Sequence, residues 1–388
     1  MIFEKAQNFI EKNIIYIIFF IYFLFMFVCY FGSNYFFFVR EMEFGYLTGG
    51  DSKRYIIGSE KILNLEFPDR KSYLGYMLYI AFFKFFNLNL TYVVYSQIFL
   101  TFLSSICIYK ISIKLSSRVG GIFCLSLYLF YFPIQVWNFY ILTETLFICS
   151  IIFLLFFLIF FQKKYIPIII FLFIFAVSIR PHGIILILSF FMAFIIWAYL
   201  RNNLKLFWFS ILTICILSYP TFLILNLYIA DQNIEYQIAN AGILWGYKEL
   251  NNGLEFKMSD KSNGDIYSLL IFLKNNAYVF VNSFLKKIWY FLLRIRPHYS
   301  DFHNLYLIIF NIIYYPLAIY GFIKLKSKKS LGVILIYILI ICFTFTAGLT
   351  FADWDSRFSL YIIPLFFILA GVGFDSLINL KEKFYKFK

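Results

Sequence analysis

Long apolar runs separated by short polar segments form the dominant pattern of this sequence. Four of them, at residues 14–39, 139–161, 206–229 and 331–349, approach or exceed the roughly 20 residues that a helix needs to cross the hydrocarbon core of a bilayer. The runs are continuous rather than alternating, which predicts helices rather than strands. The pattern therefore predicts an all-α integral membrane protein, and its first run is interpreted as an uncleaved signal anchor.

Composition excludes a soluble globular protein. Hydrophobic residues make up 62% of the 388 residues and charged residues only 14%, and no soluble chain of this length could bury so much apolar surface. The net charge of +14 does not predict a nucleic-acid partner, because no basic stripe interleaved with aromatic residues is present. The six cysteines lie inside apolar runs without metal-like spacing and are interpreted as small hydrophobic residues.

Loop charge sets the expected topology. If the short run at 73–88 crossed the membrane, the basic residues between 110 and 118 would lie outside, against the positive-inside rule. We therefore interpret that run as a surface helix. The remaining runs predict a single membrane domain of about ten spans with its N-terminus inside, at 14–39, 92–113, 119–136, 142–161, 165–180, 183–200, 206–230, 304–323, 331–350 and 358–378. Inner segments then hold 17 Lys and Arg against four acids, whereas outer segments hold the other 17 against 16 acids.

Two long segments are predicted on the outer, non-cytoplasmic face, at 40–91 and 231–303. Inner connections are only a few residues long, and they contain no Walker-type glycine loop for a nucleotide. Binding and catalysis concentrate on loops that a rigid scaffold holds. We therefore expect the chemistry of this protein on its outer face.

The leading candidate site is the acidic motif at 49–55, where Asp51 follows two glycines and precedes a helical pattern through residue 63. Arg54 and Tyr55 follow at spacings of three and four, on the same helical face. The Asp51 carboxylate is a candidate general base on an acceptor hydroxyl, while cations hold a phosphate. The alternative is a capped interfacial helix with an ordinary surface ion pair.

Four further charged residues are expected on the same face. Arg70 and Lys71 precede the surface helix, where they either bind a lipid phosphate or extend to the headgroups. Glu144 stands at the outer end of a span, as a functional acid or as a helix cap. Arg180 precedes Pro181 in a tight outer turn, and it either points into the same outer cavity or extends to the membrane boundary.

The second outer segment ends in an amphipathic, interfacial helix at 284–296 and a polar turn. Arg296 or His298 is expected to contact a phosphate. A metal site made of His298, Asp301 and His303 is an alternative that lacks a fourth ligand, so no metal site is predicted, although a divalent cation remains an option.

Arg357 begins the final span after a short outer loop. The loop holds it near the headgroup plane, where it can pair with Asp353 or Asp355 or accept a lipid phosphate in bidentate fashion.

In their order and topology these motifs resemble the GT-C polytopic glycosyltransferases, especially the phospholipid-carrier-dependent members related to protein O-mannosyltransferases and aminoarabinose transferases. The resemblance covers most of the chain. It rests on Asp51 with its Arg54 and Tyr55, the surface helix that follows, Glu144, the turn at 180–181 and Arg357. The chain lacks the Lys-Pro-Pro signature of the aminoarabinose transferases, and it lacks a soluble C-terminal domain of the kind found in the oligosaccharyltransferase catalytic subunit. The sugar and the acceptor are therefore not specified.

The resemblance implies a GT-C-type bundle with interfacial helices on its outer face, in the bacterial cytoplasmic membrane. It also implies inverting transfer from a polyprenyl-phosphate-linked sugar donor to a lipid-linked or other glycan acceptor, with Asp51 as the base and arginines on the carrier phosphate.

Two alternatives stay open. One is an O-antigen or capsule polymerase, which has similar spans and outer loops. The other is a lipid-linked glycan flippase or other transporter, which broken helices and ionisable groups near the midplane would favour.

Overall fold

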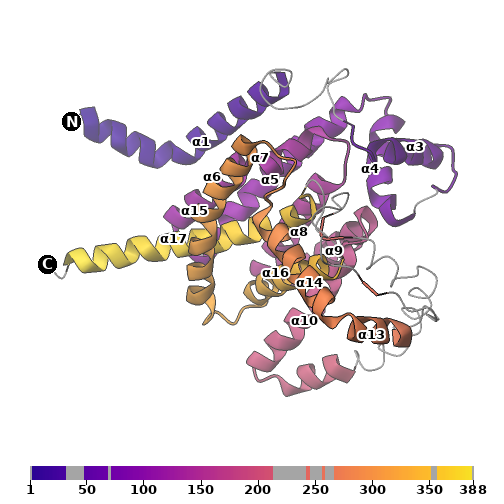
Figure 1. The fold of residues 1–388 in the computed structure, drawn as a ribbon. Coiled ribbons are helices and arrows are strands. Elements are labelled where there is room, and N and C mark those ends of the chain that lie inside the picture. Colours follow the sequence, from indigo (N-terminus) through magenta and orange to yellow (C-terminus); the bar gives the residue numbers. More distant parts are fainter. Residues whose placement is uncertain are drawn as a thin grey trace. The chain divides into compact units, whose positions relative to one another are not determined.

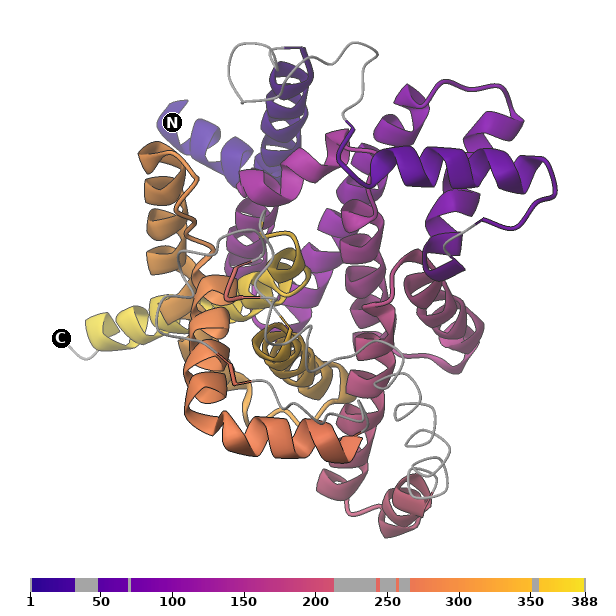
Figure 2. The same cartoon turned by 45° about the vertical axis from the view of Figure 1, so that its right-hand side comes forward.

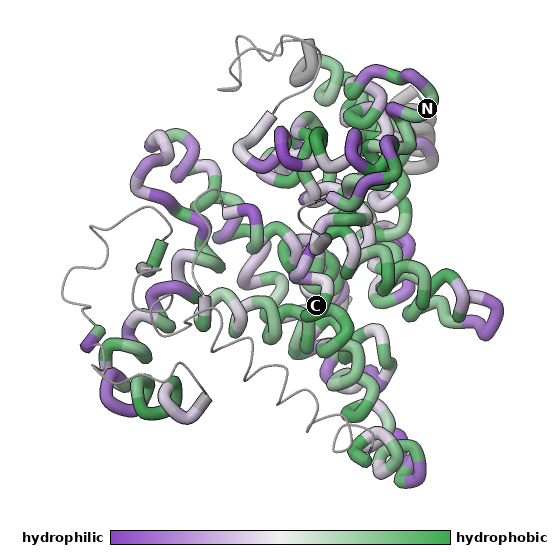
Figure 3. Tube along the Cα trace, turned by 90° about the vertical axis from the view of Figure 1, so that its right-hand side faces the viewer, coloured by the Kyte–Doolittle hydropathy of each residue, from purple (hydrophilic) through white to green (hydrophobic). Residues whose placement is uncertain are grey.

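The computed structural model describes residues 2–31, 48–68, 71–212, 242–244, 256–257, 266–350 and 356–386, and structural statements refer to these residues (Figure 1). Helices make up the regular structure in these ranges, and no strand occurs there. The predicted all-α class is confirmed for this part of the chain. Polar residues concentrate at helix ends and in the turns between helices, whereas the middles of the helices are mostly hydrophobic (Figure 3).

The chain forms two compact units. The first comprises Met1–Leu186, Tyr315–Ser327 and Pro364–Lys388, and the second comprises Ile187–Tyr314 and Lys328–Ile363.

The first unit contains the N-terminal helices and the predicted first outer segment. Its helices, including three short 3-10 turns labelled η, are α1 (Ile2–Phe31), α3 (Ser52–Leu63), η1 (Lys71–Tyr73), α4 (Leu74–Phe85), α5 (Thr91–Leu115), α6 (Arg118–Phe130), α7 (Phe132–Gln135), η2 (Val136–Phe139), α8 (Glu144–Ile159), η3 (Lys163–Tyr165) and α9 (Ile166–Ile179). The unit also includes most of α17 (Ile363–Lys386) and the C-terminal part of α15 (Asp301–Leu325).

Helix α5 is central to this unit, because it packs along α6 and α8, while α8 packs on α9. Helices α3 and α4 lie side by side, and α4 also packs on α9 (Figure 2). Close approach of α6 and α17 depends on glycine: a Cβ at Gly120 would lie 2.5 Å from the Gly371 carbonyl oxygen. This contact resembles the small-residue interfaces by which membrane helices pack without a hydrophobic driving force between them.

The second unit contains most of α10 (Gly183–Leu200), α13 (Ile266–Asn275), α14 (Ala277–Leu293), α16 (Leu331–Leu349) and η5 (Phe358–Tyr361). Helix α14 packs on α16, where the ring of Phe284 lies against Gly348. The buried Lys287 ammonium donates a hydrogen bond of 2.7 Å to the Thr350 carbonyl just after α16. A cation at a helix C-terminus is favourable because the last carbonyls carry partial negative charge.

Five helices have the length and composition of membrane spans: α5, α10, α15, α16 and the Ile363–Leu380 part of α17. A sixth candidate is bent by 57° between Arg118–Phe130 and Phe132–Phe139. These helices are compatible with a multi-pass membrane protein, whereas the count of ten stays a prediction. The predicted spans at 14–39 and 206–230 extend beyond the described residues.

Four predicted spans differ in form from the structure. The continuous span at 119–136 is wrong, because the helix ends at Phe130 and the chain bends. The spans at 142–161 and 165–180 form α8 and α9 of 16 and 14 residues, which at about 1.5 Å per residue are roughly 24 and 21 Å long. The last predicted span begins with η5, so its continuous helix starts only at Ile363.

Residues 73–88 contain one short helix, and their place at the membrane surface stays a prediction. Helix α4 has only 12 residues, about 18 Å, which is much shorter than the roughly 30 Å hydrocarbon core. The predicted helix ending at residue 63 is confirmed as α3. The interfacial helix expected at 284–296 begins earlier, at Ala277, and ends at Leu293, where Arg294 adopts a left-handed φ of 63°.

Candidate active site

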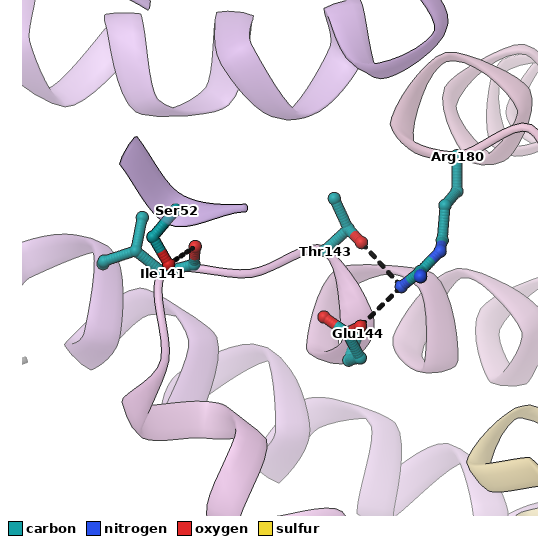
Figure 4. Close-up of polar contacts among 5 residues, drawn as sticks. All are labelled: Ser52, Ile141, Thr143, Glu144 and Arg180. Atoms are coloured by element: carbon teal, nitrogen blue, oxygen red, sulfur yellow. Dashed lines mark hydrogen bonds and ion pairs between the residues drawn. The ribbon is translucent and has the colours of Figure 1, made fainter. Parts of the chain in front are cut away.

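The start of α3 is fastened to the loop that precedes α8 by the side chain of Ser52. Its hydroxyl donates a 2.9 Å hydrogen bond to the Ile141 carbonyl (Figure 4). The same hydroxyl accepts a hydrogen bond of 2.8 Å from the Gly49 amide. Ser52 is fully buried, and a Cβ at Gly49 would lie only 3.1 Å from the Leu142 side chain. Two segments 89 residues apart in sequence therefore meet, and they carry Asp51 and Glu144.

Glu144 and Arg180 form a buried ion pair beside this contact. The Arg180 Nη1 atom lies 2.6 Å from Glu144 Oε1 and also donates a 2.8 Å hydrogen bond to the Thr143 hydroxyl (Figure 4). The two charged side chains are 1% and 6% exposed. The sequence predicted both residues at the outer ends of spans, and the structure brings them together as partners of each other at the start of α8 and the end of α9.

Asp51 and Arg54 form a second ion pair, and this one is open to solvent. Arg54 Nη1 lies 3.1 Å from Asp51 Oδ1, as their three-residue spacing predicted, and both side chains are about half exposed. Asp51 occupies the N-cap position of α3, but its side chain caps no backbone amide, so the predicted capping role is wrong. The carboxylate is instead accessible from outside the protein, which a general base for a diffusing acceptor requires.

Tyr55 points away from this exposed pair into the interior of the unit. Its ring lies 5.2 Å from the rings of Tyr73 and Tyr76, and its hydroxyl makes no hydrogen bond to any residue that the structure describes. Burial raises the pKa of the Tyr55 hydroxyl well above its usual range, Tyr73 and Glu144 raise it further, and Arg180 opposes them. The Tyr55 hydroxyl therefore stays protonated, and the charges of the buried ion pair influence its pKa.

His182 adjoins the same ion pair in the turn after α9. Burial is the first cause that lowers the pKa of its imidazole to about 3, the positive charge of Arg180 lowers it as well, and Glu144 acts in the opposite direction. His182 is therefore neutral at physiological pH, so it adds no positive charge for a phosphate.

The loop before α8 is held by polar side chains that the sequence analysis missed. Gln97 of α5 donates to the carbonyls of Asn138 and Tyr140, both at 2.9 Å. The Asn138 side chain accepts hydrogen bonds from Thr101 and Thr145. Gln97 and Asn138 are single polar residues within apolar runs, which is the signal that would have marked them.

Three of the predicted phosphate ligands belong to the second unit. Arg296 is buried, and its Nη1 atom donates to the Tyr290 carbonyl at 2.6 Å and to the Ile295 carbonyl at 3.1 Å. Burial, and then Arg296, lowers the pKa of His298. Arg357 is partly exposed and precedes η5. Their expected contact with a phosphate stays a prediction.

The remaining predicted site residues are described in part or not at all. Arg70 lies outside the described residues, as do Asp353 and Asp355, and only the backbone of Lys71 is described. Within the described ranges no three His, Cys, Asp or Glu side chains gather as a metal site. His298, Asp301 and His303 therefore do not form the alternative metal site, and the His303 ring stacks on Tyr299 at 4.1 Å instead.

The described residues form a helical protein that is compatible with a multi-pass membrane protein, and a buried and an exposed ion pair lie near the linked starts of α3 and α8. The chain matches no known family model, and no curated protein or solved structure resembles it significantly.

Proposed function

We propose that this protein is an inverting membrane glycosyltransferase of the GT-C type, which transfers a sugar from a polyprenyl-phosphate-linked donor to an acceptor hydroxyl on the non-cytoplasmic face. The observation that carries the proposal is the hydrogen bond between Ser52 and the Ile141 carbonyl. It fastens the segment bearing the exposed Asp51 carboxylate to the segment bearing the buried Glu144–Arg180 pair. The accessible Asp51 carboxylate is thereby linked to a segment that carries a buried ion pair.

In this mechanism Asp51 removes the proton from the acceptor hydroxyl. The acceptor oxygen forms a bond to the anomeric carbon while the bond from that carbon to the phosphate oxygen breaks, and the phosphate leaves with the electron pair. Attack on the face opposite the phosphate inverts the configuration. Because negative charge grows on the leaving phosphate, cations that are already in place lower the barrier more than they tighten the ground state.

The arginines of the two ion pairs have different environments and therefore different proposed roles. Arg180 is buried and already neutralised by Glu144. We therefore assign it a structural role, which is to hold the end of α9 against the start of α8. Arg54 is exposed and shares the outer end of α3 with Asp51. A guanidinium can contact a carboxylate and a phosphate at once, which makes Arg54 the phosphate ligand of the first unit. Lys71, Arg70, Arg296, His298 and Arg357 are proposed as further contacts to the carrier or the acceptor.

The broken helix at 131 favours a second candidate, a lipid-linked glycan flippase or other transporter. Discontinuous helices with buried polar groups mark the substrate sites of many transporters, and the bent pair α6 and α7–η2 with its polar partners has both features. The ion pairs of this unit lie at helix ends, however, which favours the transferase.

A transfer assay decides between these functions. The purified protein in proteoliposomes is given a panel of undecaprenyl-phosphate-linked hexoses and pentoses together with a membrane-lipid extract as acceptor. We expect a mass gain of one sugar per acceptor, and Asp51→Asn lowers the rate by about 100-fold or more. The matched control is Glu60→Gln, an acid on the same helix that is paired with Lys84, and it leaves the rate unchanged.

Other results identify the rivals. Full activity of Asp51→Asn overturns the assignment of the base. A ladder of repeats identifies a polymerase, and movement of labelled donor across the bilayer without transfer identifies a transporter.

A further inference from the structure

The chain bends between α6 and α8, so some backbone groups there lose their helical hydrogen-bond partners. A lipid environment offers no other partners for them. Each such group left unpaired in hydrocarbon would cost several kcal/mol. Side chains from this segment and from neighbouring elements form hydrogen bonds with these groups. Gln135 donates a 2.8 Å hydrogen bond to the Tyr128 carbonyl at the end of α6, and the Asn138 and Tyr140 carbonyls are taken by Gln97.

Gln97 uses its whole amide in this position. Its Nε2 atom donates both hydrogens, at 2.9 Å each, to the Asn138 and Tyr140 carbonyls, and its Oε1 atom accepts from the Tyr76 hydroxyl at 3.1 Å. The side chain is fully buried. One residue of α5 thereby joins the broken segment to α4.

The Asn138 side chain fixes the same segment to the helices on both sides. Its Oδ1 atom accepts hydrogen bonds from Thr101 of α5 at 2.8 Å and from Thr145 in the first turn of α8 at 3.0 Å. Its Nδ2 atom donates to Gln135. The start of α8 is therefore tied to a segment whose main chain Gln97 holds.

This segment lies between the two carboxylates of the proposed site. Its Ile141 carbonyl receives the Ser52 hydroxyl next to Asp51, and two residues later Thr143 and Glu144 bind Arg180. We infer that Gln97 is a positioning residue, which sets the separation of Asp51 and Glu144 through its two hydrogen bonds to the 138–140 backbone. This inference rests on the proposed function for its catalytic consequence, and on geometry alone for the rigidity of the segment.

The test compares Gln97→Met with Tyr76→Phe in the full-length protein. The first variant is similar in size and removes all three hydrogen bonds, whereas the second removes only the bond that Gln97 accepts. We expect hydrogen exchange of the peptide covering 138–143 to accelerate in Gln97→Met and to stay close to wild type in Tyr76→Phe. Gln97→Glu, which keeps the acceptor but lacks the amide donors, replaces Gln97→Met if the latter does not fold.

The same variants are assayed for transfer with the undecaprenyl-phosphate-linked sugar panel. Misplacing a reacting group by about 1 Å costs on the order of 100-fold in rate, so kcat of Gln97→Met should fall by about 10- to 100-fold while KM for the donor changes less than about threefold. A purely structural role would lower the yield of folded protein and leave kcat per folded molecule unchanged.

Two results overturn the inference: unchanged exchange at 138–143 in Gln97→Met, or faster exchange with an unaltered kcat. If the wild-type protein transfers no sugar at all, the proposed function fails, and the exchange measurement still decides whether Gln97 holds the segment.

Discussion

Glu144 and Arg180 make an ion pair of 2.6 Å, the same length as the contact between Glu60 and Lys84, yet the two pairs differ in burial, above all at the carboxylate. The side chains of Glu144 and Arg180 are 1% and 6% exposed, whereas those of Glu60 and Lys84 are 57% and 19% exposed. The distance between the charged atoms therefore does not tell which pair contributes more to stability. Removing one partner of a buried pair leaves an uncompensated charge, while an exposed charge regains water.

Glu144→Gln is expected to destabilise the protein far more than Glu60→Gln. Breaking a buried pair costs about 3–5 kcal/mol, and breaking an exposed pair costs less than about 1 kcal/mol. Unfolding of the two variants and the wild type in one detergent, by heat or by denaturant, measures the difference.

The double variant Glu144→Leu with Arg180→Met separates charge from packing. It removes both charges, so it should be more stable than Glu144→Gln. Equal losses of stability in Glu144→Gln and Glu60→Gln would show that water reaches the Arg180 pair and that the pair does not hold α8 and α9 together.

Local parts of this site could be predicted from sequence, and the parts that depend on distant contacts could not. The helix after Asp51 and its pairing with Arg54 follow from spacings of a few residues. Glu144 and Arg180 were each expected on the outer side, but their pairing spans 36 residues and depends on how α8 packs against α9. The hydrogen bond from Ser52 to Ile141 joins residues that are 89 positions apart, and the local sequence around neither residue indicates it.

The break after Phe130 is a different case, because a local signal for it existed. Pro133 stands in the first turn of α7, and proline disfavours helical geometry in the residue before it and suits a helix start. Hydropathy averaged over a long apolar run conceals that signal. Gln97 and Asn138 stand out in the sequence as polar residues within apolar runs, but their hydrogen bonds to each other's segment follow only from the bend in the structure.

Gly75→Ala is expected to separate α4 from α9. A Cβ at this position would lie 2.2 Å from the Ser178 hydroxyl oxygen and 3.0 Å from the backbone carbon of Ser178. The side chain can rotate but the backbone cannot, so Ser178→Ala should restore only part of the loss. Overpacking of this kind costs about 1–3 kcal/mol, and unfolding measurements in detergent test it.

Gly50→Ala is the matched control for this variant, because no atom lies within 4 Å of the added methyl group. It should change stability by less than about 0.5 kcal/mol. Wild-type stability of Gly75→Ala would mean that α4 does not rest on α9 in the membrane.

The side of the membrane on which Asp51 lies depends on whether α4 crosses the bilayer. Lys53 precedes α4, Asn89 follows it, and both residues are exposed. In a cysteine-free background, Lys53→Cys and Asn89→Cys should both react with a membrane-impermeant maleimide from outside intact cells, because α4 is too short to span. Lys164→Cys, in the exposed turn between α8 and α9, should react only after the membrane is permeabilised.

The labels at residues 53 and 89 test α4, and those at 89 and 164 test the helices from α5 to α8. Labelling of Lys53→Cys and Asn89→Cys from opposite sides would make α4 a crossing and place the basic residues near 114 outside, against the charge bias that oriented the chain. Labelling of Asn89→Cys and Lys164→Cys from one side would show an even number of crossings between them, where α5, the bent α6 segment and α8 predict three. The first result would place Asp51 and the start of α8 on opposite sides of the membrane, so one outer site could not use both Asp51 and Glu144. The second would overturn the predicted topology, in which Glu144 lies outside and the α8–α9 turn lies inside.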